Sequence, residues 1–403
     1  MIKTVCSRGK IVAKTGNEVM AEAMRQIEPD VVAAYPITPA TEIVQIFSQF
    51  VADGIIKSEF VAVESEHSAM STTIAASAAG ARAMTATSSQ GLSLMWEMLY
   101  IASGLRLPVV MAEVNRALSA PINIHGDQSD TMGARDSGWI QIYSENSQEA
   151  YDNMIQSIRI AEKAKLPAFV TTDGFIISHC MEVVEVYPDV DVKAFIGEYK
   201  PDRYLLDVKN PYTLGSIDLQ DYYFEHRYQL AKAMTDAKDI ILDVADDFKE
   251  TFGREYGLYE KYMIDDAEIA IVVIGSVAGT SKVVVKELRK RGIKAGLLKI
   301  RVYRPFPSYQ IAKDLKRIKA VAILDKADSC SGAFGPIYSD VAASLCSIGM
   351  VSSCPKIVNY VYGLGGREIN TDHIFSIYEK LKKIVLGVEN FSNKIEYINV
   401  RIK

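Results

Sequence analysis

The stretch AAYPITPAT, residues 33–41, places Thr38 between two prolines at the point where a strand pattern gives way to a helical one. Proline fixes φ at about −65° and pushes the preceding residue towards extended geometry, so Pro36 and Pro39 stiffen the turn. Because proline also suits the first position of a helix, the pattern predicts Thr38 as the N-cap and Pro39 as the first helical residue. Such a turn either only caps a structural helix or aims a hydroxyl and a helix N-terminus at a bound anion.

Strand and helix patterns alternate around this turn, from residue 17 to about residue 175. Alternation of this kind predicts an α/β fold with a doubly wound, largely parallel sheet, helices on both faces and functional loops at one strand-end edge. Residues 176–265 break the rhythm and predict a linker with a long helix around residues 225–250. The alternation then resumes, so we expect two domains, residues 1–250 and 251–403.

The composition excludes several classes of protein. The 403 residues carry a net charge of −5 without a basic tract, which argues against nucleic acid as a partner. The sequence has no apolar run near twenty residues and no signal-peptide pattern, so we expect a cytoplasmic protein without membrane contact. The cysteines lack a C-x-x-C spacing, which predicts isolated thiols and no zinc ribbon, iron–sulfur ligand run or disulfide framework; they are Cys6, Cys180, Cys330, Cys346 and Cys354.

The first chemical candidate is EFVAVESEHSAMS, residues 59–71, where Glu64 and Glu66 end a strand and open a helix. A carboxylate at a helix N-terminus usually serves only the helix dipole. Here, however, the helix continues with small residues, which allow a backbone or a flat cofactor to come close. On spacing alone Glu64 and Glu66 are rivals for a functional role.

The second candidate is EVNRALSAPINIHGDQSD, residues 113–130, where Arg116 follows a buried strand pattern. Its guanidinium stands where ligands gather in such folds and can bind a carboxylate with a fork of two hydrogen bonds. Asp127 and Asp130 show no third ligand and read as solvated loop acids, so we expect no metal on this chain. His125 either orients Asp127 or simply lies in the loop.

Two further turns are glycine-containing. In ATSSQGLSLM, Gln90 and Gly91 lie between a strand and a helix, where the glycine either admits a ligand or only eases the turn. In YGLGGRE, residues 362–368, the glycines do not fit G-x-G-x-x-G and read as a strand-end turn. The chain also lacks the G-D-G signature that holds diphosphate and magnesium in thiamine enzymes.

Five motifs, YPITPAT, ESEHSA, ATSSQGLSLM, NRALSAPINIHGDQSD and RVYRPFP, follow one another in the order found in one family. The chain resembles the alpha subunit of pyruvate:ferredoxin oxidoreductase in its multi-subunit form. The resemblance implies a pyrimidine-type thiamine-diphosphate-binding domain followed by a transketolase C-terminal-like domain. It also implies oxidation of pyruvate with CoA to acetyl-CoA and CO2, with electrons passed to ferredoxin.

The resemblance also implies roles for residues and partners. Glu66 matches the glutamate that hydrogen-bonds the thiamine pyrimidine, Thr38 and Arg116 match contacts to the substrate carboxylate, and Gln90 and Gly91 fall in the cofactor-binding turn. A beta subunit would share the thiamine diphosphate and supply Mg2+, and 4Fe-4S clusters would lie on the beta, gamma and delta subunits. The missing G-D-G motif and cluster cysteines would then belong to these partner chains.

Three alternatives remain open at the level of sequence. The small residues after Arg116, and the absence of a second basic anchor beside it, favour pyruvate. The same scaffold could act on 2-oxoglutarate, branched-chain oxoacids or oxalate. A non-catalytic scaffold that only binds redox partners is the third reading, and it would not need Thr38, Glu66 and Arg116.

Overall fold

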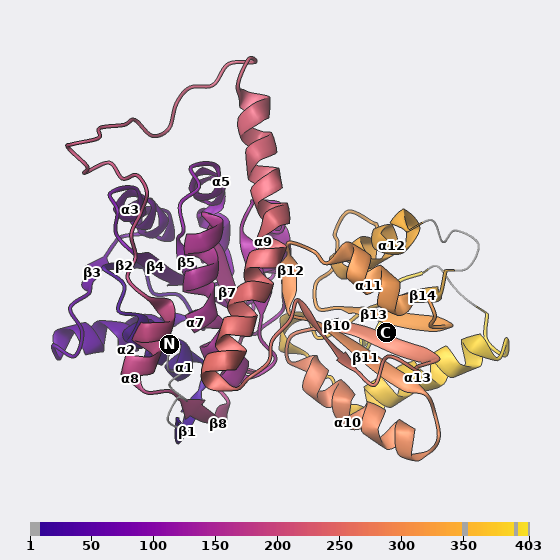
Figure 1. The fold of residues 1–403 in the computed structure, drawn as a ribbon. Helices are drawn as coiled ribbons and strands as arrows, with labels where there is room; N and C mark the ends of the chain where they lie inside the picture. The colour runs from indigo at the N-terminus through magenta and orange to yellow at the C-terminus, as the bar shows by residue number, and fades with distance from the viewer. Residues whose placement is uncertain (1–8, 349–353, 391–393, 402–403) are drawn as a thin grey trace.

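The computed structural model describes residues 9–348, 354–390 and 394–401 and folds into two α/β halves that lie side by side (Figure 1). Cys6, one of the predicted isolated thiols, lies outside these residues, while Cys180, Cys330, Cys346 and Cys354 are free thiols. The expected alternation of strands and helices is confirmed in both halves. The division of the chain at residue 250 stays a prediction, and a long helix ends close to it.

The first half is built on a seven-stranded sheet in which every pair of neighbours is parallel except at one edge. Its strands, in spatial order, are β12 (Val302–Arg304), β6 (Ile140–Tyr143), β7 (Ala168–Asp173), β5 (Val110–Asn115), β4 (Ala83–Thr87), β2 (Val31–Ala34) and β3 (Glu59–Ala62). The central strands β4, β5, β6 and β7 are buried along their whole length, as continuous apolar runs in a parallel sheet require.

Helices cover both faces of this sheet. One core joins alternate strand residues to α1 (Gly16–Ile27), α2 (Thr41–Ala52), α7 (Ser147–Ala164), α8 (Asp189–Ile196) and α9 (Tyr223–Phe252). The opposite core contains α3 (Glu66–Ala78), α4 (Gln90–Leu94) and α5 (Trp96–Gly104). The short helix α6 (Ser129–Gly133) lies in the loop that follows β5. The predicted long helix around residues 225–250 is therefore confirmed as α9.

The second half is a six-stranded sheet with its own helices, shown in orange and yellow in Figure 1. Its strands, in spatial order, are β15 (Glu396–Tyr397), β14 (Lys356–Val361), β13 (Ala320–Asp325), β10 (Ile269–Ile274), β11 (Ala295–Ile300) and β9 (Tyr259–Tyr262). Its helices are α10 (Val277–Lys290), α11 (Ser308–Leu315), α12 (Pro336–Ser347) and α13 (Thr371–Val385), and η1 (Leu364–Gly366) is a 3-10 turn.

Two features differ from the sequence expectation. Residues 302–304 fall within the predicted second domain, residues 251–403, but β12 pairs antiparallel with β6 of the first sheet, through Val302 opposite Ile142. In addition, β1 (Lys10–Thr15) and β8 (Met181–Val186) form a separate antiparallel pair that the helical rhythm had not indicated. Both pairings join segments far apart in the chain, which local patterns cannot report.

The two halves also meet through a buried ion pair. Asp173, at the end of β7, lies 3.3 Å from the Lys326 ammonium, just after β13, and both side chains are almost fully buried. The backbone N–H of Ser276, just before α10, donates to the other Asp173 oxygen at 2.9 Å. Burial favours the neutral acid, but Lys326 and Ser276 outweigh it and hold the pKa of Asp173 below its ordinary value.

Candidate active site

The turn between β2 and α2 carries Thr38. The helix begins at Thr41 with Ala40 as its N-cap, and no side chain caps it, so the prediction that Thr38 is the N-cap and Pro39 the first helical residue was wrong. Residues 38–40 instead form a separate turn, and the Pro39 carbonyl accepts a hydrogen bond of 2.8 Å from the Asn17 side chain of α1. The turn leaves Thr38 exposed at the carboxyl end of the sheet.

Arg116 follows β5 and is 7% exposed. Its guanidinium donates to the Thr38 carbonyl at 2.9 Å, to the Asn123 carbonyl at 3.2 Å and to the Gln90 side-chain oxygen at 3.4 Å. Of the five N–H groups of an arginine, these bonds use three. Arg116 therefore connects the Thr38 turn to the Gln90 turn and keeps two donors for an anionic ligand.

Glu66 is the first residue of α3, and only 7% of it is exposed. Its carboxylate has no hydrogen-bond partner among the residues that the structure describes. Gly91 lies directly beside it: a Cβ atom at Gly91 would come within 2.9 Å of the Glu66 carboxylate and within 2.3 Å of the Thr87 hydroxyl. The absence of a side chain at Gly91 therefore lets this turn pack directly against the Glu66 carboxylate and the Thr87 hydroxyl.

Glu64, the rival acid, is placed differently. Its side chain is exposed and accepts a hydrogen bond from the Ser68 hydroxyl, which lowers the pKa of the Glu64 carboxyl below its ordinary value. It is an ordinary solvated acid at the start of α3. The geometry thus separates the two glutamates that spacing alone left open.

Asp130 lies beneath the site, fully covered. One carboxylate oxygen accepts from the backbone N–H of Ser89 at 3.1 Å and of Arg116 at 2.8 Å, and the other accepts from the Asn115 side chain at 2.8 Å. Asp130 therefore ties the end of β4 to the end of β5. The expectation of solvated loop acids was wrong for Asp130, which a short helix folds back under the strands, and for Asp127, which is also buried.

Ser89 is held in a conformation that residues with a side chain rarely adopt, with φ at 51° and ψ at −119°. It is completely buried, and its hydroxyl lies 2.7 Å from both the Gln90 side-chain oxygen and the Ala117 carbonyl. Such strained residues persist where surrounding contacts over-determine them, commonly at functional sites. The strain lies at the turn that presents Gln90 and Gly91.

Glu113 is a second buried acid beside Asp130. It lies within β5, is completely buried, and neither of its carboxylate oxygens has a hydrogen-bond partner among the described residues. Burial, reinforced by the Asp130 carboxylate, raises the pKa of Glu113 well above its ordinary value, and burial raises the pKa of Asp130 to about 6. Sequence analysis missed Glu113 because a single acid within an apolar strand reads as an interruption of the pattern.

The second half of the molecule reaches the site through the YGLGGRE turn. The Asn123 side chain donates to the Gly365 carbonyl at 3.0 Å, and the backbone N–H of Gly365 donates to Asp127 at 3.1 Å. A Cβ at Gly366 would come within 2.5 Å of His125. Asp127 is therefore bound by this turn and by Ser129, while His125 packs against Phe175, so His125 does not orient Asp127.

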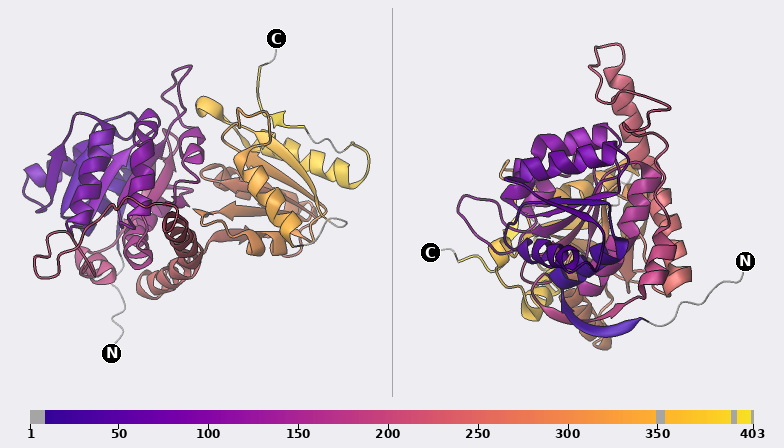
Figure 2. Two further views of the ribbon diagram at one scale, coloured as in Figure 1. Left: turned by 90° about the horizontal axis from the view of Figure 1, so that it is seen from above. Right: turned by 90° about the vertical axis from the view of Figure 1, so that its left-hand side faces the viewer.

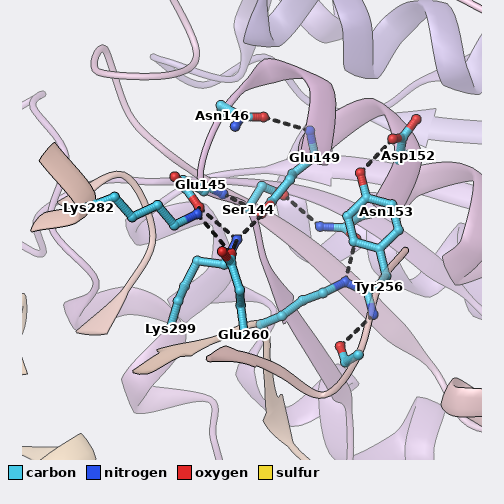
Figure 3. A network of polar contacts seen from close by, with 12 residues as sticks. Ser144, Glu145, Asn146, Glu149, Asp152, Asn153, Tyr256, Glu260, Lys282 and Lys299 are labelled. Atoms are coloured by element: carbon cyan, nitrogen blue, oxygen red, sulfur yellow. Dashed lines mark hydrogen bonds and ion pairs between the residues drawn. The ribbon is translucent and has the colours of Figure 1, made fainter. Parts of the chain in front are cut away.

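A separate acidic cluster lies between the two halves, away from this site (Figure 3). Carboxylate oxygens of Glu145, Glu149 and Glu260 lie within 4.8 Å of one another, a spacing that could hold a cation. Lysine ammonium groups occupy this position: Lys299 pairs with all three acids, and Lys282 pairs with Glu145 at 2.7 Å and Glu260 at 2.8 Å. Burial opposes the charge on Lys299, but the three carboxylates outweigh it and raise its pKa.

All five residues singled out from the sequence lie in one continuous region at the carboxyl edge of the first sheet. Arg116 joins Thr38 to Gln90, and the neighbouring Gly91 packs against Glu66. An unpaired, nearly buried carboxylate beside a glycine suits the ring nitrogen of an aminopyrimidine, and a guanidinium with free donors suits a carboxylate. The fold and this site define a thiamine-diphosphate-binding α/β protein.

Family models place the chain more closely. Residues 22–246 match the thiamine-diphosphate-binding domain of pyruvate flavodoxin/ferredoxin oxidoreductases, and residues 267–374 match core domain II of pyruvate:ferredoxin oxidoreductase. The chain belongs to the pyruvate:ferredoxin oxidoreductase family. The resemblance inferred from the five motifs is thereby confirmed.

Individual relatives agree with this assignment. The chain is 54% identical to pyruvate synthase subunit PorA of Thermotoga maritima, over 91% of this chain and 93% of the relative. It is 46% identical to pyruvate synthase subunit PorA of Methanocaldococcus jannaschii, over 95% and 97% of the two chains. It is also 42% identical to ketoisovalerate oxidoreductase subunit VorA of Pyrococcus abyssi, over 92% and 93%.

Among solved structures, the fold is similar to a 2-oxoglutarate:ferredoxin oxidoreductase from Magnetococcus marinus, with a TM-score of 0.71 and 19% identity. The similarity covers 94% of this chain and 66% of that chain. At this level of identity, the match supports the fold alone. A search of the described helices for a segment long and apolar enough to cross a bilayer finds none.

Proposed function

We propose that this chain is the alpha subunit of a pyruvate:ferredoxin oxidoreductase, which converts pyruvate and CoA to acetyl-CoA and CO2 and passes the electrons to ferredoxin. The observation that carries the proposal is the continuous contact from Thr38 through Arg116 and Gln90 to the Gly91–Glu66 pair. It brings an anion-binding group and a pyrimidine-binding group to the same sheet edge.

Each residue of this group has a distinct task in the proposal. Glu66 hydrogen-bonds the pyrimidine ring nitrogen and holds a proton there, and Gln90 and Gly91 form the cofactor-binding turn, in which Gly91 packs against Glu66. Arg116 and the Thr38 hydroxyl bind the oxoacid carboxylate. Arg116 also fixes the Thr38 turn through its carbonyl, so little ordering remains to be done when the substrate binds. Thiamine diphosphate, when bound, supplies the nucleophilic carbon and the electron sink for decarboxylation.

The remaining components of the enzyme are proposed on other chains. A beta subunit would complete the thiamine diphosphate site with Mg2+, and 4Fe-4S clusters on the beta, gamma and delta subunits would lead to ferredoxin. CoA enters as co-substrate, and the complex would work in the cytoplasm. The domain division at residues 1–250 and 251–403 belongs to this proposal.

The choice of pyruvate rests on the pocket around Arg116. Residues 113–130 contain no basic side chain other than Arg116 and His125, and His125 packs against Phe175. A dicarboxylic oxoacid would need a second basic anchor. A branched-chain oxoacid is the second candidate, because the VorA relative is nearly as similar as the PorA relatives.

The test is the oxoacid-dependent reduction of ferredoxin or a viologen by the complex copurified anaerobically with this chain. Pyruvate, 2-oxoglutarate and 3-methyl-2-oxobutanoate are compared, each with and without CoA and thiamine diphosphate. We expect pyruvate to give the highest kcat/KM by at least tenfold. Preference for either other acid would keep the Glu66 assignment and refute the pocket assignment.

The catalytic assignment is tested by Glu66→Gln, with Glu64→Gln as the matched control two residues away. Loss of a positioned proton-transfer group costs about 10²- to 10⁴-fold in rate, so Glu66→Gln should lose at least a hundredfold in kcat. Glu64→Gln should keep nearly full activity because that carboxylate is exposed. An assembled Glu66→Gln complex with full activity would instead favour the non-catalytic scaffold.

A further inference from the structure

A segment of the first half stands away from the body of the molecule. We call residues 205–228 the arm; it comprises the irregular chain before α9 and the first turns of that helix. Both Figure 1 and the right-hand view of Figure 2 show it rising beyond the helices that cover the sheet. Long irregular segments that are held in place usually serve binding, because they bury little of themselves.

The surface of the arm is unusually apolar. Val208 is 88% exposed, Ile217 92% and Phe224 77%. Other large apolar side chains of the arm are also exposed, namely Leu205, Leu206, Leu219, Tyr222, Tyr223 and Tyr228. Single exposed apolar residues are ordinary, but a contiguous group of this size marks an interaction surface. Tyrosine and phenylalanine are also among the residues enriched in protein interfaces.

The base of the arm is fixed to the body at three points. The backbone N–H of Leu205 donates to the Ala78 carbonyl at the end of α3, at 2.8 Å. Tyr204 packs against Gly80, where a Cβ would come within 2.9 Å of its ring. Leu214 packs against the core beneath α3 and α5. The arm is therefore held against this helical layer while its apolar side chains face outward.

A partner subunit would bind to this same layer of helices. Glu66 begins α3 and Gly91 lies in α4, so a subunit that completes the thiamine site approaches over these helices; this step rests on the proposed function. Apolar side chains are exposed on α4 and α5 as well, namely Leu94, Trp96 and Ile101. The arm stands beside this face and continues its apolar surface beyond the body.

We infer that the arm binds the subunit that carries the diphosphate-binding half of the thiamine site. Burial of its exposed apolar side chains, at roughly 100 Å² each, would remove on the order of 800 Å² from water, which is the contribution of one partner to a stable interface. A self-associated pair of arms would use the same area but would leave the incomplete site uncovered. The single occupant that accounts for both features is this partner subunit.

The experiment alters the outward side chains of the arm in the co-expressed complex. The variant combines Val208→Ser, Ile217→Ser and Phe224→Ser; the matched control combines Ile11→Ser, Val190→Ser and Val388→Ser, which are 64%, 72% and 75% exposed outside the arm. Native mass spectrometry and size-exclusion chromatography measure the partner subunit bound per copy of this chain. We expect at least tenfold less bound partner for the arm variant and an unchanged amount for the control.

Two results would overturn the inference. Retention of the partner at the unaltered level would show that the arm does not hold it. If the arm variant lost self-association but still bound the partner subunit, the arm would instead bind a second copy of this chain. Hydrogen exchange of the unaltered chain, alone and in the complex, gives an independent measure: backbone amides of residues 212–221 should be protected only in the complex. Because neither readout uses activity, a complex that assembles through the arm but does not oxidise pyruvate would refute only the proposed function.

Discussion

At the scale of single residues, the candidate site rests on two acids that are buried beneath it, Asp130 and Glu113. Asp130 accepts from the backbone N–H groups of Ser89 and Arg116 and so fixes the turn that carries Gln90 and Gly91 relative to Arg116. Glu113 lies beside it without a hydrogen-bond partner among the described residues. Burial and the neighbouring Asp130 carboxylate both oppose a charge on Glu113 and raise its pKa well above the ordinary value.

The raised pKa of Glu113 makes the stability of the chain depend on pH. In the unfolded chain a glutamate titrates near its ordinary pKa of about 4.3, whereas the folded pKa is raised, so the folded state holds the extra proton between these values. The free energy of unfolding should therefore fall as pH rises, by up to about 1.4 kcal/mol per pH unit from this group. Its contribution is fully present below about pH 4 and is lost as pH rises through the folded pKa.

Glu113→Gln should remove this dependence. Relative to the unaltered protein, the variant should gain stability from pH 5 to pH 7, by up to about 3 kcal/mol over the interval. Urea unfolding at each pH measures the difference. Glu59→Gln, which changes an exposed glutamate, is the control and should leave the pH slope unchanged. A Glu113→Gln slope equal to that of the unaltered protein would show that Glu113 is charged in the folded state.

Sequence reasoning singled out Thr38, Glu66 and Arg116, which the structure brings to one sheet edge, but missed the buried acids beneath them. Thr38, Glu66 and Arg116 stand in motifs with strong local signatures, at turns that follow strands. Asp130 was weighed only as a metal ligand, and Glu113 was not considered. Their roles arise from contacts between strand ends that are neighbours in space, and a linear pattern carries no information about the depth at which an acid will lie.

At the scale of elements, the η1 turn of the second half supports the loop that follows β5. Gly365 exchanges hydrogen bonds with Asn123 and Asp127, and Arg116 in turn holds the Asn123 carbonyl. The sequence indicated a glycine-rich strand-end turn here but could not show what it touches. The need for glycine becomes clear only when the two halves are docked.

Gly366→Ala tests this support. Gly366 has φ at 78°, and a Cβ would come within 2.5 Å of His125, so alanine must displace the loop that begins at Arg116. Gly292→Ala is the matched control, with φ at 76° and no atom within 4 Å of its Cβ. Both variants meet backbone strain of about 1–2 kcal/mol. Only Gly366→Ala should lower kcat/KM for the oxoacid, by tenfold or more. Equal kinetics of the two variants would contradict the support role.

At the scale of the whole molecule, the two halves are joined by charged groups buried between them. The Asp173–Lys326 pair lies at the carboxyl ends of strands from both sheets, and the Glu145 and Lys299 network crosses the same junction (Figure 3). The alternation of strands and helices predicted both sheets. The same pattern could not predict how the two sheets pack together, because each charged residue of the junction appears in the sequence only as an isolated charge at a strand end.

Asp173→Asn should loosen this junction. The change leaves the Lys326 ammonium buried beside a neutral amide, and removal of one partner of a buried pair costs about 3–5 kcal/mol. Asp265→Asn is the control: it breaks the exposed pair with Lys261, which is worth about 0.5 kcal/mol. Urea unfolding of both variants gives the comparison, and limited proteolysis between residues 253 and 268 reports separation of the halves. A loss below 1 kcal/mol for Asp173→Asn would mean that the pair does not hold the halves together.

The position of β12 affects how the first half folds while the chain is being synthesised. The β6 edge of the first sheet is complete only when Val302 pairs with Ile142. At about 5–20 residues per second, the ribosome delivers that partner roughly 8–30 s after β6 has emerged. Throughout this interval the nascent first half presents an open strand edge, which invites pairing with other chains. Translation speed and chaperone access during this stage, rather than the stability of the finished protein, should therefore limit the yield of correctly folded subunit.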